Sequence, residues 1–417
     1  MRVQPESSDQ IGNASLPILP VESPDFWADP ERFVAPARRQ HPWLARFAHG
    51  YVVHGCQASK DLLADSEHLY MGLDGIVDFY GAQGTLWAGF MNEMLNSQRG
   101  KEHARIRNAV ATTFTPRHAN QMRPLIRQVI NELLDTWAPK GQFDFAEFAS
   151  FFPIAVMCGL LGVSTEPMPR LRKALEAQLA SLTLNPAVKP DFLAGIEVMY
   201  EFTDNLVLER QASGRAEPDS LLDAMIAART AGNLNDRELR FLIMVLLFAG
   251  YDTTKNMLTM TIHLLLERPD SYDRCARDPA FCAQVVEEAL RHSNIATVFR
   301  QVKSSFVYEG FRFPEGALVA VATPLAGRDP AAFSDPMRFD PQRHIQTPHV
   351  AFGRGPHMCI GQFLARTQLQ EGLHLIAQRL HNIRRAGEIA WRPFLGAWGL
   401  RTLPVAFDTG PAVRVAR

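Results

Sequence analysis

The cysteine in segment 352–361 has the surroundings that a metal-binding thiolate needs. The segment reads Phe-Gly-Arg-Gly-Pro-His-Met-Cys-Ile-Gly, so Cys359 lies in a glycine-rich turn just before a stretch with helical periodicity. Backbone N–H groups of such a turn and the positive end of the following helix favour S⁻ over SH. The glycines also let a flat, bulky group approach the backbone, because no Cβ stands in the way. The pattern predicts a permanent metal ligand at Cys359.

Two other interpretations of Cys359 stay open. A single cysteine is most often a small, buried structural side chain. A zinc site could also combine it with His357, Cys275 and Cys282, although no short paired-ligand spacing supports one. The chain has five cysteines, an odd number at irregular spacings, which argues against a disulfide framework and favours a reducing compartment.

A second unusual segment, 249–254, reads Ala-Gly-Tyr-Asp-Thr-Thr and interrupts a long apolar run. Gly250 costs about 1 kcal/mol in a helix interior, and a buried carboxylate is costly unless it has a partner. An alcohol beside a carboxylate can relay protons in a dry pocket, so Asp252 and Thr253 are candidate catalytic residues. The alternative is a kinked helix in which Asp252 forms a salt bridge with an arginine.

Segments 352–361 and 249–254 resemble the haem-binding loop and the oxygen-activation segment of the cytochrome P450 family. The resemblance implies that Cys359 is the axial ligand of a haem b. It also implies that Thr253 organises proton delivery to O₂, while Asp252 connects the site to bulk solvent. The residues that it places against the haem, apart from the ligand, are Ala249, Gly250, Phe352, Gly353, His357 and Gly361.

Further basic and acidic residues extend the resemblance. Glu288 and Arg291 share one face of a predicted helix, and in this family such a pair closes with an arginine of a later loop, here Arg343. We expect a structural clamp; the alternative is an exposed pair worth about 0.5 kcal/mol. Haem propionates need cations when they are buried. The resemblance assigns this task to His103, Arg107, Arg300 and His357, each of which, taken alone, is more often a surface charge.

Two departures from the family pattern stand out. The acidic-x-Pro sequence that usually precedes the first histidine is replaced by 98–101, Gln-Arg-Gly-Lys. The proline often found after the Glu-x-x-Arg helix is also missing, since 292–294 reads His-Ser-Asn. The second departure leaves the alignment of the expected pocket segment after Arg291 open by a residue or two.

The elements that position these residues predict a mainly α protein with small β-sheets, and the resemblance implies a single cytochrome P450 domain over residues 1–417. The region 1–40 is expected to be a proline-rich arm packed on the domain, with 17–36 extended. One very long helix is predicted from Asn235 to Glu267, with a capping box formed with Glu238. The haem is expected between this helix and the helical segment 362–384. Strands are predicted near 50–55, 306–311, 317–321 and 401–407.

The substrate pocket, by resemblance, is built from four separate segments. Its candidate residues are Leu86, Trp87, Phe90, Val245, Phe248, Ala249, Ile295, Ala296, Thr297, Val298, Phe394, Leu395 and Trp398. Nearly all are apolar, so we expect an apolar substrate held by shape, such as a terpenoid, a steroid or an aromatic compound. Any one of them, taken alone, is more often core than pocket wall. No clear basic anchor for a carboxylate is present, because the nearby Arg392 and Arg401 can face solvent.

Composition and charge limit the remaining possibilities. Lys and Arg total 43 against 44 Asp and Glu, a net charge of −1, which removes a global electrostatic argument for nucleic acid or an anionic membrane. Residues 1–13 are polar and lack the apolar stretch of a signal peptide or anchor. We therefore expect a soluble, cytoplasmic, monomeric protein.

The resemblance implies a monooxygenase that uses O₂ and NAD(P)H-derived electrons. No fused flavin or iron–sulfur segment is recognisable, so a ferredoxin or flavodoxin with its NAD(P)H reductase is the expected donor. Such partners are acidic and would dock on local positive charge; the candidates are Arg99, Lys101, Arg105, Arg354 and Arg366. The alternatives are a peroxide-driven enzyme, which would not need the Asp252–Thr253 pair, and a non-catalytic haem sensor or carrier.

Overall fold

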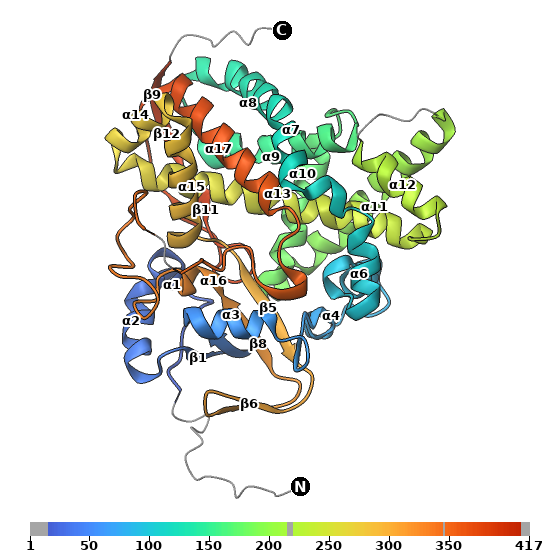
Figure 1. The fold of residues 1–417 in the computed structure, drawn as a ribbon, viewed down its shortest axis with the longest axis vertical. Helices are drawn as coiled ribbons and strands as arrows, with labels where there is room; N and C mark the ends of the chain where they lie inside the picture. The colour runs from blue at the N-terminus through green and yellow to red at the C-terminus, as the bar shows by residue number, and fades with distance from the viewer. Residues whose placement is uncertain (1–15, 215–219, 345–346, 410–417) are drawn as a thin grey trace, which may run out of the picture.

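The computed structural model describes residues 16–214, 220–344 and 347–409 and is mostly helical, with small sheets at its edges (Figure 1). The helices are α1 (Pro24–Ala28), α2 (Pro30–Gln40), α3 (Cys56–Ala64), α4 (Leu73–Tyr80), α5 (Leu86–Glu93), α6 (Gly100–Asn108), α7 (Pro116–Gln121), α8 (Arg123–Trp137), α9 (Phe145–Leu161), α10 (Met168–Ala180), α11 (Lys189–Ser213), α12 (Leu221–Thr230), α13 (Asp236–Leu266), α14 (Pro269–Arg277), α15 (Pro279–His292), α16 (Thr323–Ala326) and α17 (Gln362–Arg379). Among the described residues, no helix is both long enough and apolar enough for a membrane span.

In the described part of the chain, the strands form four small sheets rather than one large one. They are β1 (Leu44–Phe47), β2 (Gly50–Val53), β3 (Leu69–Tyr70), β4 (Gln142–Asp144), β5 (Thr297–Val302), β6 (Phe306–Tyr308), β7 (Phe311–Phe313), β8 (Leu318–Ala322), β9 (Leu380–Arg385), β10 (Ala390–Trp391), β11 (Leu400–Thr402) and β12 (Pro404–Thr409). The largest has the order β1-β2-β8-β5-β3, with β2 and β8 parallel and the other neighbours antiparallel. The prediction of a mainly α protein with small sheets is confirmed.

The central helix α13 begins where its capping box predicts. The Asn235 side chain accepts a bond from the Glu238 N–H, and the Glu238 carboxylate accepts one from the Asn235 N–H, both at 2.8 Å. The helix has 31 residues, which at 1.5 Å per residue is about 46 Å. It packs against α9, α10, α11, α15 and α17, and most of its apolar residues are buried. The core of the protein therefore surrounds α13.

The prediction of an extended arm over 17–36 is wrong for its second half. Only its beginning is extended, where Ile18 forms a bridge with Arg46. The short helices α1 and α2 follow, capped by the side chains of Ser23 and Asp29. Each has proline at its first position, where the missing N–H costs nothing and the fixed φ suits a helix. The prolines thus mark helix starts, and residues 1–15 of the predicted arm lie outside the described part.

The helix predicted over 362–384 is also too long at its end. α17 stops at Arg379, and the chain continues as β9, which pairs antiparallel with β12. The start of α17 is the functionally important end, because it follows the cysteine loop directly. α17 packs against α8, α13, α14 and α15, so the loop is attached to the core through a long, buried helix.

Candidate active site

The cysteine loop owes its shape to two glycines. Gly353 and Gly355 have φ angles of 70° and 74°, a region that side chains other than glycine rarely adopt. A Cβ at Gly355 would also lie 2.9 Å from the Ala64 backbone, so this glycine lets the loop touch α3. The Cys359 N–H donates to the Phe352 carbonyl at 2.9 Å and closes the loop.

Cys359 differs from every other cysteine in the part of the chain that the structure describes. It is accessible to solvent, whereas Cys56, Cys158, Cys275 and Cys282 are buried. Surrounding protein nevertheless raises the pKa of the Cys359 thiol, against the opposing effects of the Gly361 N–H, Arg107 and Arg366. These three groups favour the thiolate but do not outweigh the desolvation of the sulfur by the protein around it, so the loop by itself does not stabilise S⁻ over SH as the sequence predicts. A coordinated metal ion deprotonates a thiol outright.

A cluster of basic side chains lies near the loop and has no carboxylate partner among the residues that the structure describes. The His103 and His357 rings have centroids 4.3 Å apart. Arg300 is 3% exposed and bonds the Met71 sulfur at 2.8 Å; Arg107 donates to a backbone carbonyl of the loop at 2.8 Å. Burial, followed by the neighbouring basic groups, lowers the pKa of His357 to about 3, and burial lowers the pKa of Arg300 to about 10.

These four side chains fit the group that the sequence resemblance implies. Arg107 is half-buried and Arg300 is buried, and such cations lack compensation unless an anion joins them. Within the described ranges, neither arginine has an ion pair with an acidic side chain. The pKa values of His103 and His357 lie below their ordinary value, so these rings contribute N–H donors and no fixed charge. Two carboxylates of a bound haem would supply the missing negative charge. The accessible cysteine, the two arginines and the two imidazole donors together therefore suit a thiolate-ligated haem.

The interrupted segment of α13 forms an opening in an otherwise buried helix. Ala249 is exposed, and Gly250 and Thr253 are half-buried, between residues that are fully buried. The Thr253 hydroxyl donates back to the Ala249 carbonyl at 2.7 Å. A Cβ at Gly250 would meet the Met157 sulfur of α9 at 3.3 Å. Gly250 thus allows two helices to pack closely, and Ala249 is the small residue on the open side.

Asp252 is fully buried and held by a salt bridge. Arg392, in the turn after β10, contacts both carboxylate oxygens, at 2.8 and 2.7 Å. Lys255 lies 3.4 Å away, and the Asn256 amide donates at 3.3 Å. Burial alone would raise the pKa of Asp252, but Arg392 and Lys255 outweigh it and hold the pKa below its ordinary value. The expectation that Arg392 can face solvent is wrong, and the arginine partner considered for Asp252 exists.

The Glu288–Arg291–Arg343 group meets as the spacing suggests. Arg291 is completely buried and binds the Glu288 carboxylate at 2.6 and 2.8 Å. It also donates to the carbonyls of Gly327, Pro336 and Arg338. Arg343 reaches the same carboxylate at 3.2 Å. The three side chains join α15 to the irregular segment 327–343 that leads toward the cysteine loop.

The candidate pocket residues separate into two groups. Leu86, Ala249, Ala296 and Val298 are at least partly open, whereas Trp87, Phe90, Val245, Phe248, Ile295, Thr297, Phe394, Leu395 and Trp398 are buried. The two late segments do come together, because the Thr297 N–H donates to Gly396 and the Trp398 N–H donates to Ile295. The open residues are therefore the stronger candidates for direct substrate contact.

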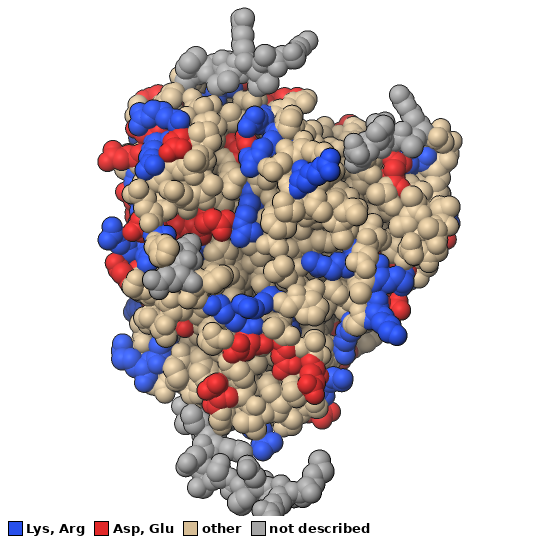
Figure 2. Space-filling model, viewed as in Figure 1, with Lys and Arg blue, Asp and Glu red and all other residues tan. Residues whose placement is uncertain are grey.

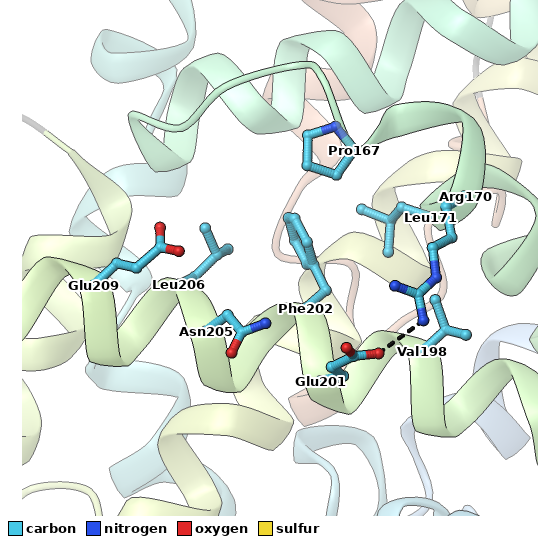
Figure 3. Close-up of a pocket in the computed structure, with 9 residues that line it drawn as sticks. All are labelled: Pro167, Arg170, Leu171, Val198, Glu201, Phe202, Asn205, Leu206 and Glu209. Atoms are coloured by element: carbon cyan, nitrogen blue, oxygen red, sulfur yellow. Dashed lines mark hydrogen bonds and ion pairs between the residues drawn. The ribbon is translucent and has the colours of Figure 1, made fainter.

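A surface groove between α10 and α11 was not anticipated from the sequence. Figure 3 shows its apolar side chains, among them Phe202 and Leu206, beside an ion pair of Arg170 with Glu201 at 2.7 Å. None of the predicted site residues lines it. Both members of the ion pair are largely exposed, so the groove is an outer feature of the helices that pack over α13.

The five basic residues expected to attract a redox partner are not equally free. Arg105 binds Glu102 and Glu238, and Arg366 binds Glu287 at 2.6 Å. Arg99 lies over the Tyr70 ring at 3.7 Å. The exposed Lys101 and Arg354 have no ion pair in the described part of the chain. Figure 2 shows basic and acidic side chains mixed on the face that carries α17.

Comparison with known proteins matches this geometry to one family. A family model described as Cytochrome P450 matches residues 85–278 and 280–382. The luteothin monooxygenase of Streptomyces thioluteus is 35% identical over 401 residues, covering 94% of this chain and 97% of that protein. The 6-deoxyerythronolide B hydroxylase of Saccharopolyspora erythraea is 32% identical over 315 residues, covering 73% and 76%.

Solved structures agree with the fold. The myxobacterial cytochrome P450 CYP267B1 in complex with myristic acid has a TM-score of 0.85 and 26% identity, covering 93% of this chain and 98% of that one. Epothilone B-bound cytochrome P450epoK also has a TM-score of 0.85, at 22% identity over 93% and 99%. The second likeness concerns the fold alone.

Proposed function

Because this chain belongs to the cytochrome P450 family and is a P450 monooxygenase, we propose that it hydroxylates an apolar small molecule with O₂ and two electrons from a ferredoxin-type partner. The observation that carries the proposal is Cys359, the accessible cysteine of the described chain, in a loop beside four basic side chains that lack carboxylate partners. When bound, a thiolate-ligated haem supplies O₂ binding and cleavage of the O–O bond.

The protein's own residues would hold the haem and manage protons. Cys359 would bind the haem iron through its thiolate, and His103, Arg107, Arg300 and His357 would bind the propionates. Thr253 would hold a proton-carrying hydroxyl at the opening of α13, with Asp252 next to it. The surrounding apolar side chains would exclude bulk water, which protects the reaction from side reactions.

The substrate is proposed to be a sizeable apolar natural product with some oxygen functions. The open pocket residues Leu86, Ala249, Ala296 and Val298 are apolar, which favours recognition by shape. Relatives are named for luteothin, 6-deoxyerythronolide B and mycinamicin IV. These names favour a compound of the luteothin or macrolide kind over the terpenoids, steroids and simple aromatics that the pocket composition also allows.

The electron donor is proposed to be a ferredoxin, or a flavodoxin, that docks near the cysteine loop and is reduced by an NAD(P)H reductase. Lys101 and Arg354 are exposed basic residues that an acidic partner could contact. Arg105 and Arg366 are weaker candidates, since their guanidinium groups already bind carboxylates.

The alternatives are a peroxide-driven enzyme and a haem sensor or carrier without turnover. The proposal prefers O₂ activation because Asp252 and Thr253 are both present beside the opening in α13. Product formation with peroxide, but none with O₂ and a reduced ferredoxin, would favour the first alternative. Tight ligand binding without any product would favour the second.

The test is optical titration of the purified ferric protein with luteothin, 6-deoxyerythronolide B and a steroid, followed by turnover with a surrogate ferredoxin. We expect a saturable change in the Soret band and an oxygenated product. Cys359→Ser should abolish both the thiolate-type ferrous–CO spectrum and the product, while Cys158→Ala, which removes a buried cysteine elsewhere, should retain them. Retained product in Cys359→Ser would overturn the assignment.

A further inference from the structure

The buried carboxylate of Asp252 has no direct contact with solvent, although it lies next to Thr253. It is 0% exposed, and its oxygens are engaged by Arg392, Lys255 and Asn256. In this arrangement, Arg392, Lys255 and Asn256 are the side chains from which Asp252 could receive a proton. An amide is a poor proton carrier, and arginine does not give up its proton in proteins. Lysine is the group of the three that can be both donor and acceptor of a proton.

Lys255 connects the buried carboxylate to an exposed one. Its Nζ lies 3.4 Å from Asp252 Oδ1 and 3.0 Å from Glu176 Oε1. The Lys255 side chain is 10% exposed, whereas that of Glu176, on α10, is 39% exposed. The Arg392 side chain is itself 17% exposed but keeps its proton. Among the contacts of Asp252 in the described chain, Lys255 is therefore the proton-exchanging group that also touches a solvent-exposed carboxylate.

Glu176 is fixed in this position from a second side. The Tyr251 hydroxyl donates to Glu176 Oε1 at 2.8 Å, and Tyr251 is itself buried. Burial and the neighbouring carboxylates raise the pKa of Tyr251, so its hydroxyl keeps its proton and remains a donor. The carboxylate is held beside Lys255 instead of rotating away into solvent.

Arg392 holds the other end of this chain. Its guanidinium binds both carboxylate oxygens of Asp252 and also donates to the Asn256 side-chain oxygen at 3.1 Å. Two close hydrogen bonds from a planar guanidinium fix the orientation of a carboxylate. The charged or titratable groups around Asp252 are thus Lys255 and Tyr251 from α13, Glu176 and Arg172 from α10, and Arg392 from the turn after β10.

We propose that Glu176 and Lys255 form the proton route from solvent to Asp252, and that Arg392 is the positioning residue that keeps Asp252 aligned with it. Glu176 takes a proton from water. Lys255 gives one of its protons to Asp252 and is reprotonated by Glu176, and Asp252 passes the proton toward Thr253. One proton enters and one leaves at each step, and no electrons move. This inference rests on the proposed function, since the route serves O₂ activation.

The experiment compares Lys255→Met and Glu176→Gln with the matched control Glu201→Gln, which alters an exposed carboxylate of α11 (Figure 3). The readouts are the solvent deuterium isotope effect on turnover and the ratio of product to peroxide. For Lys255→Met we expect about a tenfold slower turnover with more peroxide. This is less than a positioned acid–base group can contribute, about 10²- to 10⁴-fold, because water can partly replace the lysine. Glu176→Gln should be slowed about threefold.

A second readout does not depend on turnover. The infrared carboxyl band of the resting protein, followed against pH, reports the protonation of Asp252. In Arg392→Gln and in Lys255→Met, the Asp252 carboxyl should protonate at higher pH than in the wild type, because each variant removes one of its two cationic partners. Arg392→Lys keeps a positive charge and should bring the titration partly back toward that of the wild type. Asp252→Asn identifies the band. If the carboxyl band of Asp252 appears at the same pH in both variants as in the wild type, the electrostatic part of the proposal is wrong.

The outcomes separate this inference from the proposed function. Product from the wild type with unchanged isotope effect and coupling in Lys255→Met and Glu176→Gln would refute the route and leave the monooxygenase intact. Absence of product from the wild type itself would be a failure of the proposed function. If Lys255→Met does not fold, the surface variant Glu176→Gln still tests the route. Slower turnover than in Glu201→Gln would support the route, and the same turnover in both variants would reject it.

Discussion

Removing the guanidinium of Arg291 should destabilise the protein more than almost any other single change outside its apolar core. The side chain is completely buried, binds Glu288 through two N–H groups and supports three backbone carbonyls. In Arg291→Met the Glu288 carboxylate, 1% exposed, keeps Arg343 and the Asp340 N–H as its donors from the described residues. Breaking one partner of a buried ion pair costs about 3–5 kcal/mol.

That loss is a large part of the stability of a typical domain, about 5–15 kcal/mol. Unfolding entropy is about 2.1 cal/mol/K per residue, so for 417 residues a loss of about 4 kcal/mol lowers Tm by about 5 °C. The control is Arg338→Met, in the same segment, whose side chain is 67% exposed and whose loss should stay within about 0.5 kcal/mol. The assay is thermal unfolding followed by circular dichroism.

A second variant separates the ion pair from simple packing. Glu288→Gln with Arg291→Met removes both charges, and it should be less destabilised than the sum of the single variants, because no unpaired carboxylate remains. Arg291→Lys should recover only part of the stability, since an ammonium cannot reproduce the planar set of donors. If Arg291→Met unfolds at the same temperature as Arg338→Met, the clamp does not hold the segment and the reasoning fails.

Three further predictions follow from the site and its supports. Thr253→Ala should lower product per O₂ about tenfold while O₂ consumption continues, measured as released peroxide. Burial would raise the pKa of Glu287, but its neighbours His349 and Arg366 outweigh burial and lower this pKa from 4.5 to about 2. The ionised Glu287 therefore adds to the free energy of unfolding above pH 4.5, and this contribution is lost as the pH falls toward 2. In Glu287→Gln, the free energy of unfolding should depend less on pH over this range. Charge reversal of Lys101 with Arg354 should slow electron transfer from a ferredoxin several-fold and weaken its salt dependence; an unchanged rate would exclude this surface.

Signals between residues that are close in the sequence were sufficient to predict the helices that carry the site residues. The capping box at Asn235 and Glu238 places the start of α13 correctly, because the signal lies within four residues. The spacing of Glu288 and Arg291 on one helical face gives their pairing for the same reason. The proline-rich N-terminal region misled the prediction, since proline is also the preferred first residue of a helix and the periodic signal of a five-residue helix is too short to read.

Contacts between distant segments could not be predicted from such signals. Arg392 follows Asp252 by 140 residues, and nothing in either neighbourhood indicates that the turn after β10 returns to α13. The same applies to Glu176, whose helix has no motif of its own. The sequence suggested the Asp252–Thr253 pair, but the side chains that set its charge come from tertiary packing.

The departure at 292–294 shows how a hydrogen-bonded side chain can replace a proline. The Asn294 side-chain oxygen accepts from the N–H groups of Ile295 and Ala296 at 2.6 and 3.3 Å. This is the turn that asparagine can form with its own backbone. Its amide donates to the Thr323 hydroxyl, which in turn donates to the Ala296 carbonyl at 2.6 Å. Both ends of the turn are therefore fixed to α16, and the partly open Ala296 is held in place by a network that a proline ring could not provide, because proline has no side-chain donor or acceptor.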